Sequence, residues 1–321
     1  MDLSSLSQSL SANRLSFPLL ECARELRDPL RDRYARARRG LETGGFGRAA
    51  RGHTIRHPWR TLQLLVGESD RSGPVWGVTM VRNEEARIEG SLRCLLEGGV
   101  DVIIVADNLS TDGTRDLLDQ LSRELPIVVV TDHEPAHYQG PKMSRLARLA
   151  ARSGASWIVP FDADELWYGV GAPLAPVLRS LDGDIAVADM YDFLPDAVRA
   201  ASDDPYHDFS LRTAAPVTEK VAFRAHLLAA IASGNHAVSQ PGRKVRDAIR
   251  IRHYPFLGFE HFLEKVRNGG AVLALTNLPD EIGGHWRRWG SMPDDELQHE
   301  WQQIVGKGLV EDALPSAPFL P

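Results

Sequence analysis

From Val75 onward, the chain alternates between short apolar runs and segments whose apolar residues recur three or four positions apart. The first pattern predicts buried β-strands and the second predicts amphipathic helices. Repeated strand–helix units form a parallel sheet joined by right-handed crossovers. The predicted fold class is therefore α/β, a Rossmann-like and mostly parallel sheet with helices on both faces. The four strands expected in it are residues 75–81, 100–106, 127–130 and 157–161.

The pattern is less regular on both sides of this region. Beyond Tyr168, strands are expected at 185–191 and 220–224, and helices at 259–266 and 297–304. Upstream, residues 19–41 predict a helix interrupted near Pro29, and a glycine-rich linker follows it. We expect three parts: a basic helical extension with linker (1–72), the α/β domain (73–275) and a C-terminal helical tail (276–321).

The composition is that of a globular protein with a large core, since 43% of the 321 residues are hydrophobic and 25% are charged. No apolar run approaches the roughly 20 residues that cross a bilayer, and the N-terminus lacks the apolar stretch of a signal peptide. Cys22 and Cys94 are the only cysteines, which excludes a disulfide framework and a cysteine zinc site. These features predict a cytoplasmic location.

The charge is unevenly distributed along the chain. Residues 1–60 contain 12 Arg and no Lys against 6 acidic residues, whereas the whole chain has a net charge of −6. The remainder is therefore acidic, which argues against nucleic acid as a partner, because nucleic-acid binding needs a basic face. The basic segment is compatible with a solvated helical extension and with contact to an anionic membrane surface or a protein partner.

The sharpest chemical feature is Asp162-Ala163-Asp164-Glu165, directly after the fourth predicted strand. Three carboxylates this close repel one another unless a cation or hydrogen-bond donors compensate. Two Asp residues separated by one small residue are suited to Mg²⁺ or Mn²⁺, which take one or two carboxylates together with phosphate oxygens. The alternative is a surface turn whose acids cap a helix.

A second polar segment, residues 107–114 (Asp-Asn-Leu-Ser-Thr-Asp-Gly-Thr), follows the second predicted strand. Ligands of parallel sheets bind beyond the carboxyl ends of the strands, so both segments are expected at the same edge. Asp107 can accept a hydrogen bond from a base or a ribose hydroxyl, and the next helix N-terminus favours anions. Helix-capping chemistry alone would also explain Ser110, Thr111 and Asp112.

Three segments in order, 78–84 (Val-Thr-Met-Val-Arg-Asn-Glu), 107–114 and 162–165, resemble the hallmark segments of GT-A-fold glycosyltransferases of the family 2 type. The Asp-Ala-Asp-Glu form is similar to that of a family 2-like subgroup. The resemblance extends over roughly residues 75–270. It implies a GT-A-like domain, a nucleotide-sugar donor, a divalent cation, and transfer of a sugar to a hydroxyl, usually with inversion.

The resemblance also implies roles for individual residues. Asp107 would lie near the base, and Asp162 and Asp164 would lie between the ribose and the metal-bound diphosphate. Asn108 stands where the family often has a second Asp. His236 is similar to a downstream metal-ligating His, and His253 to a recurring element of the subgroup. The residues expected to line the nucleotide at the first corner are Thr79, Val81, Asn83 and, with a weaker claim, Glu84.

Two lysines are further candidates for the donor diphosphate: Lys142, near the start of the third predicted helix, and Lys265, on a later helix. An inverting transferase also needs a general base for the attacking hydroxyl. Asp192, His253 and Glu260 are the candidates, and the sequence does not rank them.

The sequence thus predicts a hexosyltransferase-type enzyme that uses Mn²⁺ or Mg²⁺ to transfer a sugar from a nucleotide diphosphate to a saccharide or other hydroxyl acceptor. One alternative is a sugar-phosphate nucleotidyltransferase, which would carry a glycine-rich basic loop after the first strand, unlike Arg82-Asn83-Glu84-Glu85. The other is a non-catalytic module that binds a nucleotide sugar or a carbohydrate. Dinucleotide, P-loop, serine-hydrolase and zincin motifs are missing from the sequence.

Overall fold

The structure is a computed structural model that describes residues 72–195, 205–280, 282–306 and 308–312. The helix expected at 19–41 and the glycine-rich linker after it lie outside the described residues. In the described part of the chain, no helix is both long and apolar enough to span a bilayer.

Four parallel strands form the first half of the main sheet, in the order β3-β2-β1-β4. The strands are β1 (Val75–Val81), β2 (Val102–Asp107), β3 (Ile127–Thr131) and β4 (Trp157–Pro160). The helices that connect them are α4 (Ile88–Glu97), α5 (Thr114–Leu121) and α6 (Gln139–Arg152). This half of the sheet confirms the four strands, the crossover helices and the α/β class predicted from the hydrophobic pattern.

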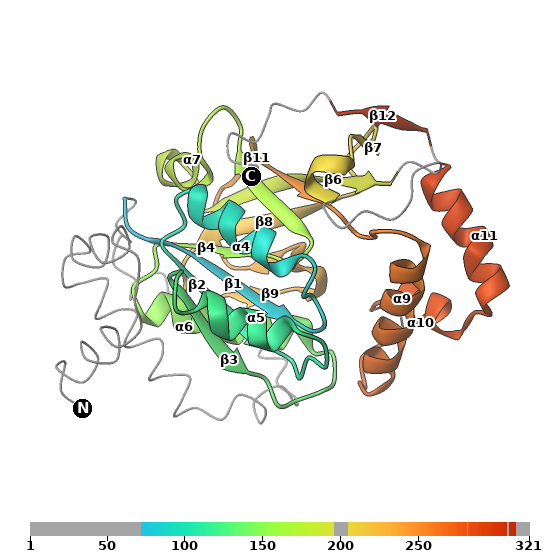
Figure 1. The fold of residues 1–321 in the computed structure, drawn as a ribbon. Helices are drawn as coiled ribbons and strands as arrows, with labels where there is room; N and C mark the ends of the chain where they lie inside the picture. The colour runs from blue at the N-terminus through green and yellow to red at the C-terminus, as the bar shows by residue number, and fades with distance from the viewer. Residues whose placement is uncertain (1–71, 196–204, 281, 307, 313–321) are drawn as a thin grey trace.

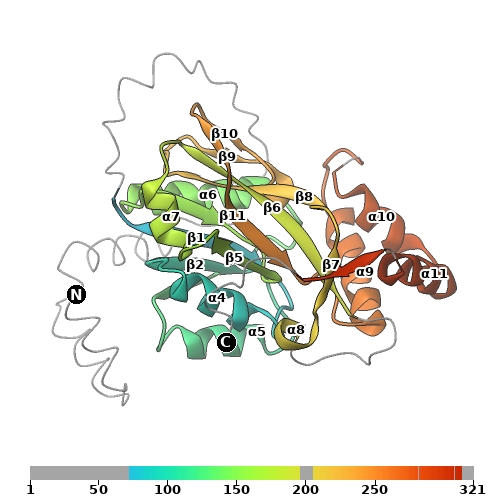
Figure 2. The ribbon, with the colours of Figure 1, turned by 90° about the horizontal axis from the view of Figure 1, so that it is seen from above.

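Helices cover both faces of the sheet (Figures 1 and 2). Successive residues of a strand point to opposite faces, and both faces of β2 are apolar. Ile103 packs into the cluster that includes Leu92 of α4 and Leu118 of α5. Its neighbour Ile104 packs into the cluster that includes Leu146 of α6. This two-sided burial explains why the strand is an almost continuous apolar run.

The second half of the sheet is mixed. Strand β8 (Thr218–Arg224) pairs antiparallel with both β4 and β6 (Ile185–Leu194). Strand β11 (Lys244–His253) pairs parallel with β6 and antiparallel with β5 (Glu165–Gly169). The register of β11 with β6 shifts between Val245 and Ile249, and Asp247 within this bulge has a φ of +63°. The long strand β11 therefore crosses the molecule and ends beside the start of β5.

Shorter elements complete this half of the described chain. Helix α7 (Leu174–Ser180) packs on β5, and β7 (Leu211–Thr213) and β12 (Leu309–Glu311) extend the sheet edge beyond β6. The remaining short elements are α8 (Pro205–Asp208), β9 (Ala230–Ile231), the 3₁₀ turn η3 (Ser233–Asn235) and β10 (Val238–Ser239).

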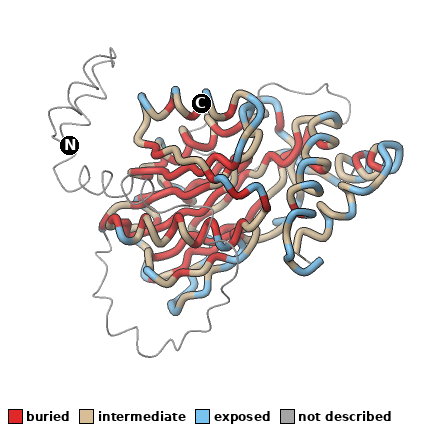
Figure 3. The backbone as a smooth tube through the Cα atoms, turned by 90° about the horizontal axis from the view of Figure 1, so that it is seen from below, coloured by how far each residue is buried: buried red, intermediate tan, exposed pale blue. Residues whose placement is uncertain are grey.

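Three helices form a lobe at one side of the sheet: α9 (Phe259–Ala274), α10 (Gly284–Ser291) and α11 (Asp294–Val305). An aromatic cluster that contains Phe262 and Trp301 holds α9 against α11. A Cβ on Gly290 would lie 2.9 Å from the Cα of Gly270, so α10 and α9 approach each other at glycines. Figure 3 shows that burial is concentrated in the sheet, while the lobe is mostly half-buried or exposed. The boundary expected at 275 follows the end of α9, and the division into domains stays a prediction.

Candidate active site

The acidic loop, which we define as residues 162–165, joins β4 to β5 in a tight turn. The amide of Glu165 donates to the carbonyl of Asp162 (3.2 Å), and the amide of Asp162 donates to the Glu165 carboxylate (3.1 Å). The indole of Trp167 also donates to this carboxylate (2.9 Å). Glu165 is fully buried, and burial raises its pKa to about 7, with the charge of Lys220 acting in the opposite direction. Glu165 is therefore the internal anchor of the acidic loop.

Asp162 is held by side chains from three separate elements. One carboxylate oxygen accepts hydrogen bonds from Gln139 at the start of α6 (3.1 Å) and from Asn235 in η3 (3.2 Å). The other oxygen is 2.5 Å from the ammonium of Lys220 on β8, which also forms an ion pair with Glu165. Burial would lower the pKa of Lys220, but the two carboxylates raise it. Lys220 therefore stays charged and neutralises part of the acidic loop.

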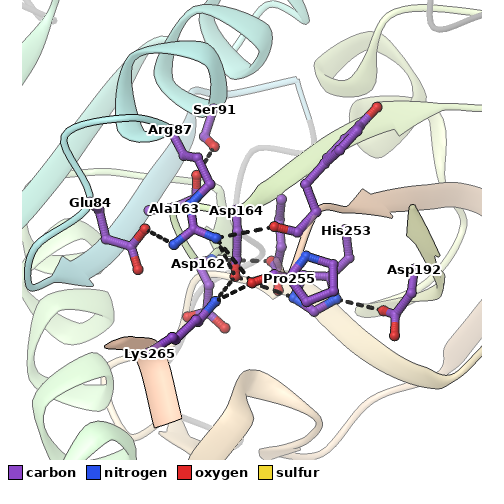
Figure 4. A network of polar contacts seen from close by, with 12 residues as sticks. Glu84, Arg87, Ser91, Asp162, Ala163, Asp164, Asp192, His253, Pro255 and Lys265 are labelled. Atoms are coloured by element: carbon purple, nitrogen blue, oxygen red, sulfur yellow. Dashed lines mark hydrogen bonds and ion pairs between the residues drawn. The ribbon is translucent and has the colours of Figure 1, made fainter. Parts of the chain in front are cut away.

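Asp164 is buried among three cationic side chains (Figure 4). Its Oδ2 atom is 2.5 Å from the Lys265 ammonium, 3.4 Å from Nε2 of His253 and 3.7 Å from the Arg87 guanidinium. Burial acts to raise the pKa of Asp164, but the positive charges of Lys265, His253 and Arg87 hold it well below the usual value. Asp164 is therefore an anion in a pocket of positive charge.

The sheet register brings His253 to Asp164. His253 ends β11, where it pairs with Asp192 of β6 on one side and with Glu165 of β5 on the other. Its Nδ1 atom is 2.6 Å from Asp192, so the Nε2 atom is the one that faces Asp164. Burial would lower the pKa of His253, but the two carboxylates raise it to about 9. In this arrangement the imidazole is cationic at neutral pH.

Arg87 connects the acidic loop to the corner after β1. Its guanidinium forms an ion pair with Glu84 and donates to the carbonyls of Tyr254 (3.1 Å) and Pro255 (3.2 Å). Burial raises the pKa of Glu84, with Arg87 and Lys265 acting in the opposite direction. Arg87 thus links Glu84 to Asp164 of the acidic loop. Figure 4 shows Glu84 and Arg87 on the side of α4.

The loops after β1 and β2 (residues 82–85 and 107–114, hereafter the paired loops) are joined by hydrogen bonds. The side-chain oxygen of Asn83 accepts from the amide of Thr111 (2.8 Å), and the amide of Asn83 donates to Ser110 (3.0 Å). The buried Asp107 accepts from the amide of Ser110 (3.2 Å) and is 3.9 Å from Arg115. The Asn83 side chain is therefore engaged by the neighbouring loop.

Thr79 and Val81 lie within β1 and are buried. The Thr79 hydroxyl has no hydrogen-bond partner among the described residues. Whether these residues line a nucleotide stays a prediction.

Lys142 and Asn108 lie in a different network from the acidic loop. The Lys142 ammonium is 2.5 Å from Asp132 and donates to the carbonyls of Glu134 (2.6 Å) and Ala136 (2.9 Å). The Asn108 amide donates to the same Asp132 (2.9 Å). All three N–H donors of the buried ammonium are occupied, so Lys142 fixes the segment after β3 rather than offering free donors to a diphosphate.

The structure does not bring His236 and Glu260 to Asp164. The Nδ1 atom of His236 faces the carbonyl of Glu219 (2.8 Å), and it is the preceding Asn235 that reaches Asp162. Glu260 is exposed in the first turn of α9. In the described residues, no group of three or more His, Cys, Asp or Glu side chains could hold a metal ion. The expected trio of Asp162, Asp164 and His236 is therefore not assembled, and His253 takes the place beside Asp164.

Sequence reasoning missed four residues of this site: Arg87, Gln139, Lys220 and Asn235. Each comes from a helix start, a strand or a turn that is distant from the acidic loop in the chain. One signal in the sequence could have indicated Asn235, because it directly precedes His236, the candidate metal ligand.

Comparisons with known proteins agree with the resemblance seen in the sequence. Residues 78–197, which contain the paired loops and the acidic loop, match the sequence model of glycosyl transferase family 2. No curated protein gives a significant match. Among solved structures, S. aureus TarS 1–349 in complex with UDP-GlcNAc is 12% identical, with 73% of this chain and 74% of that chain covered and a TM-score of 0.39.

A second solved structure is glucosyl-3-phosphoglycerate synthase from Mycobacterium tuberculosis in complex with Mn²⁺, UDP and glucosyl-3-phosphoglycerate. It is 21% identical, with 44% of this chain and 50% of that chain covered and a TM-score of 0.27. Both likenesses are too distant to transfer residue roles, so the assignment depends on the match over residues 78–197. Residues 78–197 match glycosyl transferase family 2, and this match confirms the predicted enzyme class, a glycosyltransferase.

Proposed function

We propose that this protein transfers a hexose-type sugar from a nucleotide diphosphate donor to a hydroxyl of a saccharide or another acceptor, with inversion and with Mn²⁺ or Mg²⁺. The observation that carries the proposal is the surroundings of Asp164. A buried carboxylate with Lys265, His253 and Arg87 around it lies directly after a parallel strand. Strand ends of such sheets are where ligands bind, and concentrated charge there is suited to a diphosphate. Cytoplasmic location is part of the proposal, on the ground of the cysteine content.

The residues beside Asp164 fit a divalent cation by their donor chemistry. A carboxylate oxygen and an imidazole nitrogen lie 3.4 Å apart, and Asp192 engages the other ring nitrogen of His253. His253 would give up its Nε2 proton on binding the cation, since metal binding releases protons from its ligands, and a carboxylate that orients a ligating His in this way is a common feature of metal sites. Two protein ligands leave positions for phosphate oxygens of the donor, as Mg²⁺ and Mn²⁺ sites typically do. When bound, the cation would neutralise charge that develops on the leaving diphosphate.

The remaining roles belong to the chain itself. Arg87 supplies fixed positive charge near the diphosphate and Lys265 a second positive charge, and Asp162, oriented by Gln139 and Asn235, faces the donor. Of the three candidate bases, Asp192 is the best supported. His253 with a pKa of about 9 is already protonated at neutral pH, and Glu260 lies outside the network.

The proposal is tested by a thermal-shift screen with UDP-, GDP- and dTDP-sugars, with and without Mn²⁺, followed by assays of sugar release and transfer. A donor at 100 times its dissociation constant should stabilise the protein by about 2.7 kcal/mol. Binding without release or transfer would favour a non-catalytic module. Release of pyrophosphate from a sugar phosphate and a nucleoside triphosphate would favour a nucleotidyltransferase.

A further inference from the structure

The ammonium of Lys265 occupies the carboxylate oxygen that a cation at this site would need. Oδ2 of Asp164 is 2.5 Å from Lys265 and is the same atom that faces His253 at 3.4 Å. Lys265 also donates to the carbonyl of Pro255 (3.1 Å). Figure 4 shows the Lys265 side chain approaching Asp164 from the side opposite to Arg87.

We propose that Lys265 is the counter-ion of Asp164 in the ligand-free protein. A divalent cation displaces the Lys265 ammonium from Asp164, and the ammonium then pairs with the donor diphosphate. This inference rests on the proposed function, since it concerns the same donor site. Its consequence is that the divalent cation and the nucleoside diphosphate bind cooperatively. The cation frees the Lys265 ammonium for the diphosphate, and the diphosphate draws that ammonium away from Asp164.

Lys265 is suited to this movement and Arg87 is not. The Arg87 side chain is 1% exposed and is fixed by Glu84 and by two backbone carbonyls, whereas the Lys265 side chain is 20% exposed. The lysine head is a compact charge on a flexible four-carbon stem. Arg87 therefore remains as fixed positive charge, while Lys265 can turn from Asp164 toward another anion.

Electrostatics requires the exchange. A buried carboxylate without a cation is strongly destabilised, and of the three cationic side chains around Asp164 Lys265 is the nearest, at 2.5 Å. A divalent ion and an ammonium on one carboxylate oxygen repel each other, which weakens binding of the ion to the free protein. A diphosphate adds negative charge with which the displaced Lys265 ammonium can form an ion pair, so that positive and negative charges in the site are again matched.

The experiment measures Mn²⁺ binding by electron paramagnetic resonance, in which the signal of free Mn²⁺ decreases on binding. The full chain is titrated with Mn²⁺ alone and with Mn²⁺ in saturating UDP, each against a protein-free titration, because the diphosphate of UDP itself binds Mn²⁺. For the wild type we expect UDP to tighten Mn²⁺ binding by about 5- to 150-fold, the range of typical coupling between ligands. For Lys265→Met we expect tighter Mn²⁺ binding without UDP and a smaller effect of UDP.

Lys244→Met is the matched control, because it removes the same charge from an exposed position at the start of β11; it should bind Mn²⁺ as the wild type does. Lys265→Gln serves as a second variant, with circular dichroism to verify folding. The proposal is overturned if Lys265→Met binds Mn²⁺ no more tightly than the wild type, or if the wild type binds Mn²⁺ equally with and without UDP. If no nucleotide sugar binds under any condition, the proposed function fails. The comparison of Mn²⁺ binding to the wild type and to Lys265→Met without UDP still tests the role of Lys265.

Discussion

The acidic loop and the paired loops lie at the same edge of the sheet, yet they are held in different ways. The paired loops are joined mainly by hydrogen bonds between exposed polar groups about 28 positions apart in the chain, such as those of Asn83 with Thr111. The acidic loop is held by ion pairs with partners much further away, such as Lys220 at 58 positions and Lys265 at 101. Substitutions should therefore affect local order in the first region and charge balance in the second.

The largest effect is expected for Asp164→Asn. Removal of this charge should lower kcat for sugar transfer by at least about 10²-fold, the usual loss when one electrostatic contact to the reacting groups is deleted. The fold should be retained, because Lys265 can turn toward solvent and Arg87 still forms its ion pair with Glu84. Asp162→Asn should behave in the same way.

The control for these two variants is Asp119→Asn, which removes an acid paired with Arg115 on α5. Kinetics with the donor found in the screen, together with circular dichroism, would check the expectation. Near-normal turnover of Asp164→Asn would show that the acidic loop is not the reactive centre.

Lys142→Met should affect stability more than catalysis. It leaves the buried Asp132 carboxylate without its cation, and breaking a buried ion pair in this way typically costs about 3–5 kcal/mol. Urea denaturation measures the loss, and Lys142→Met with Asp132→Asn should recover part of it. A loss below about 1 kcal/mol together with a strongly raised KM for the donor would instead make Lys142 a diphosphate ligand, as the sequence predicted.

Asn83→Ala should have the smallest effect. The variant removes exposed hydrogen bonds between the paired loops, each worth about 0.5–1.5 kcal/mol, and the ion pairs of the acidic loop remain. Asn83 could join the paired loops or contact the nucleotide. Urea denaturation and the KM for the donor, each compared with the value for Thr111→Val, separate these two roles. A raised KM in Asn83→Ala but not in Thr111→Val would show that Asn83 contacts the nucleotide, and the contrast between the two regions would then disappear.

The sequence predicted the strands, and the position of Asp162 and Asp164 after the fourth strand, because both are local signals. The run 100–106 could only be a strand buried on two faces, and Asp162 and Asp164 directly follow such a strand. Their counter-ions were not predictable in the same way, because Lys220 and His253 reach them only through the pairing of β8, β6, β11 and β5. No local pattern specifies that register.

Two side chains lie elsewhere than the sequence suggested, for local physical reasons. Lys142 was expected near the start of the third helix, but α6 begins earlier, at Gln139. Lys142 therefore falls among the buried positions of the helix. His236 follows a turn in which Gly234 and Asn235 both have positive φ, at 76° and 59°. In that turn the side chain of Asn235, not that of His236, reaches Asp162.

The bulge in β11 has a consequence for how this site is encoded. Side chains alternate between the two faces of a strand, so a slip of one residue turns every later side chain to the opposite face. Deleting a single residue between Val245 and Ile249 would thus carry His253 away from Asp192 and Asp164 without altering any of the three. The number of residues in a remote stretch of backbone, and not only the identity of the polar groups, sets the geometry of the reactive centre.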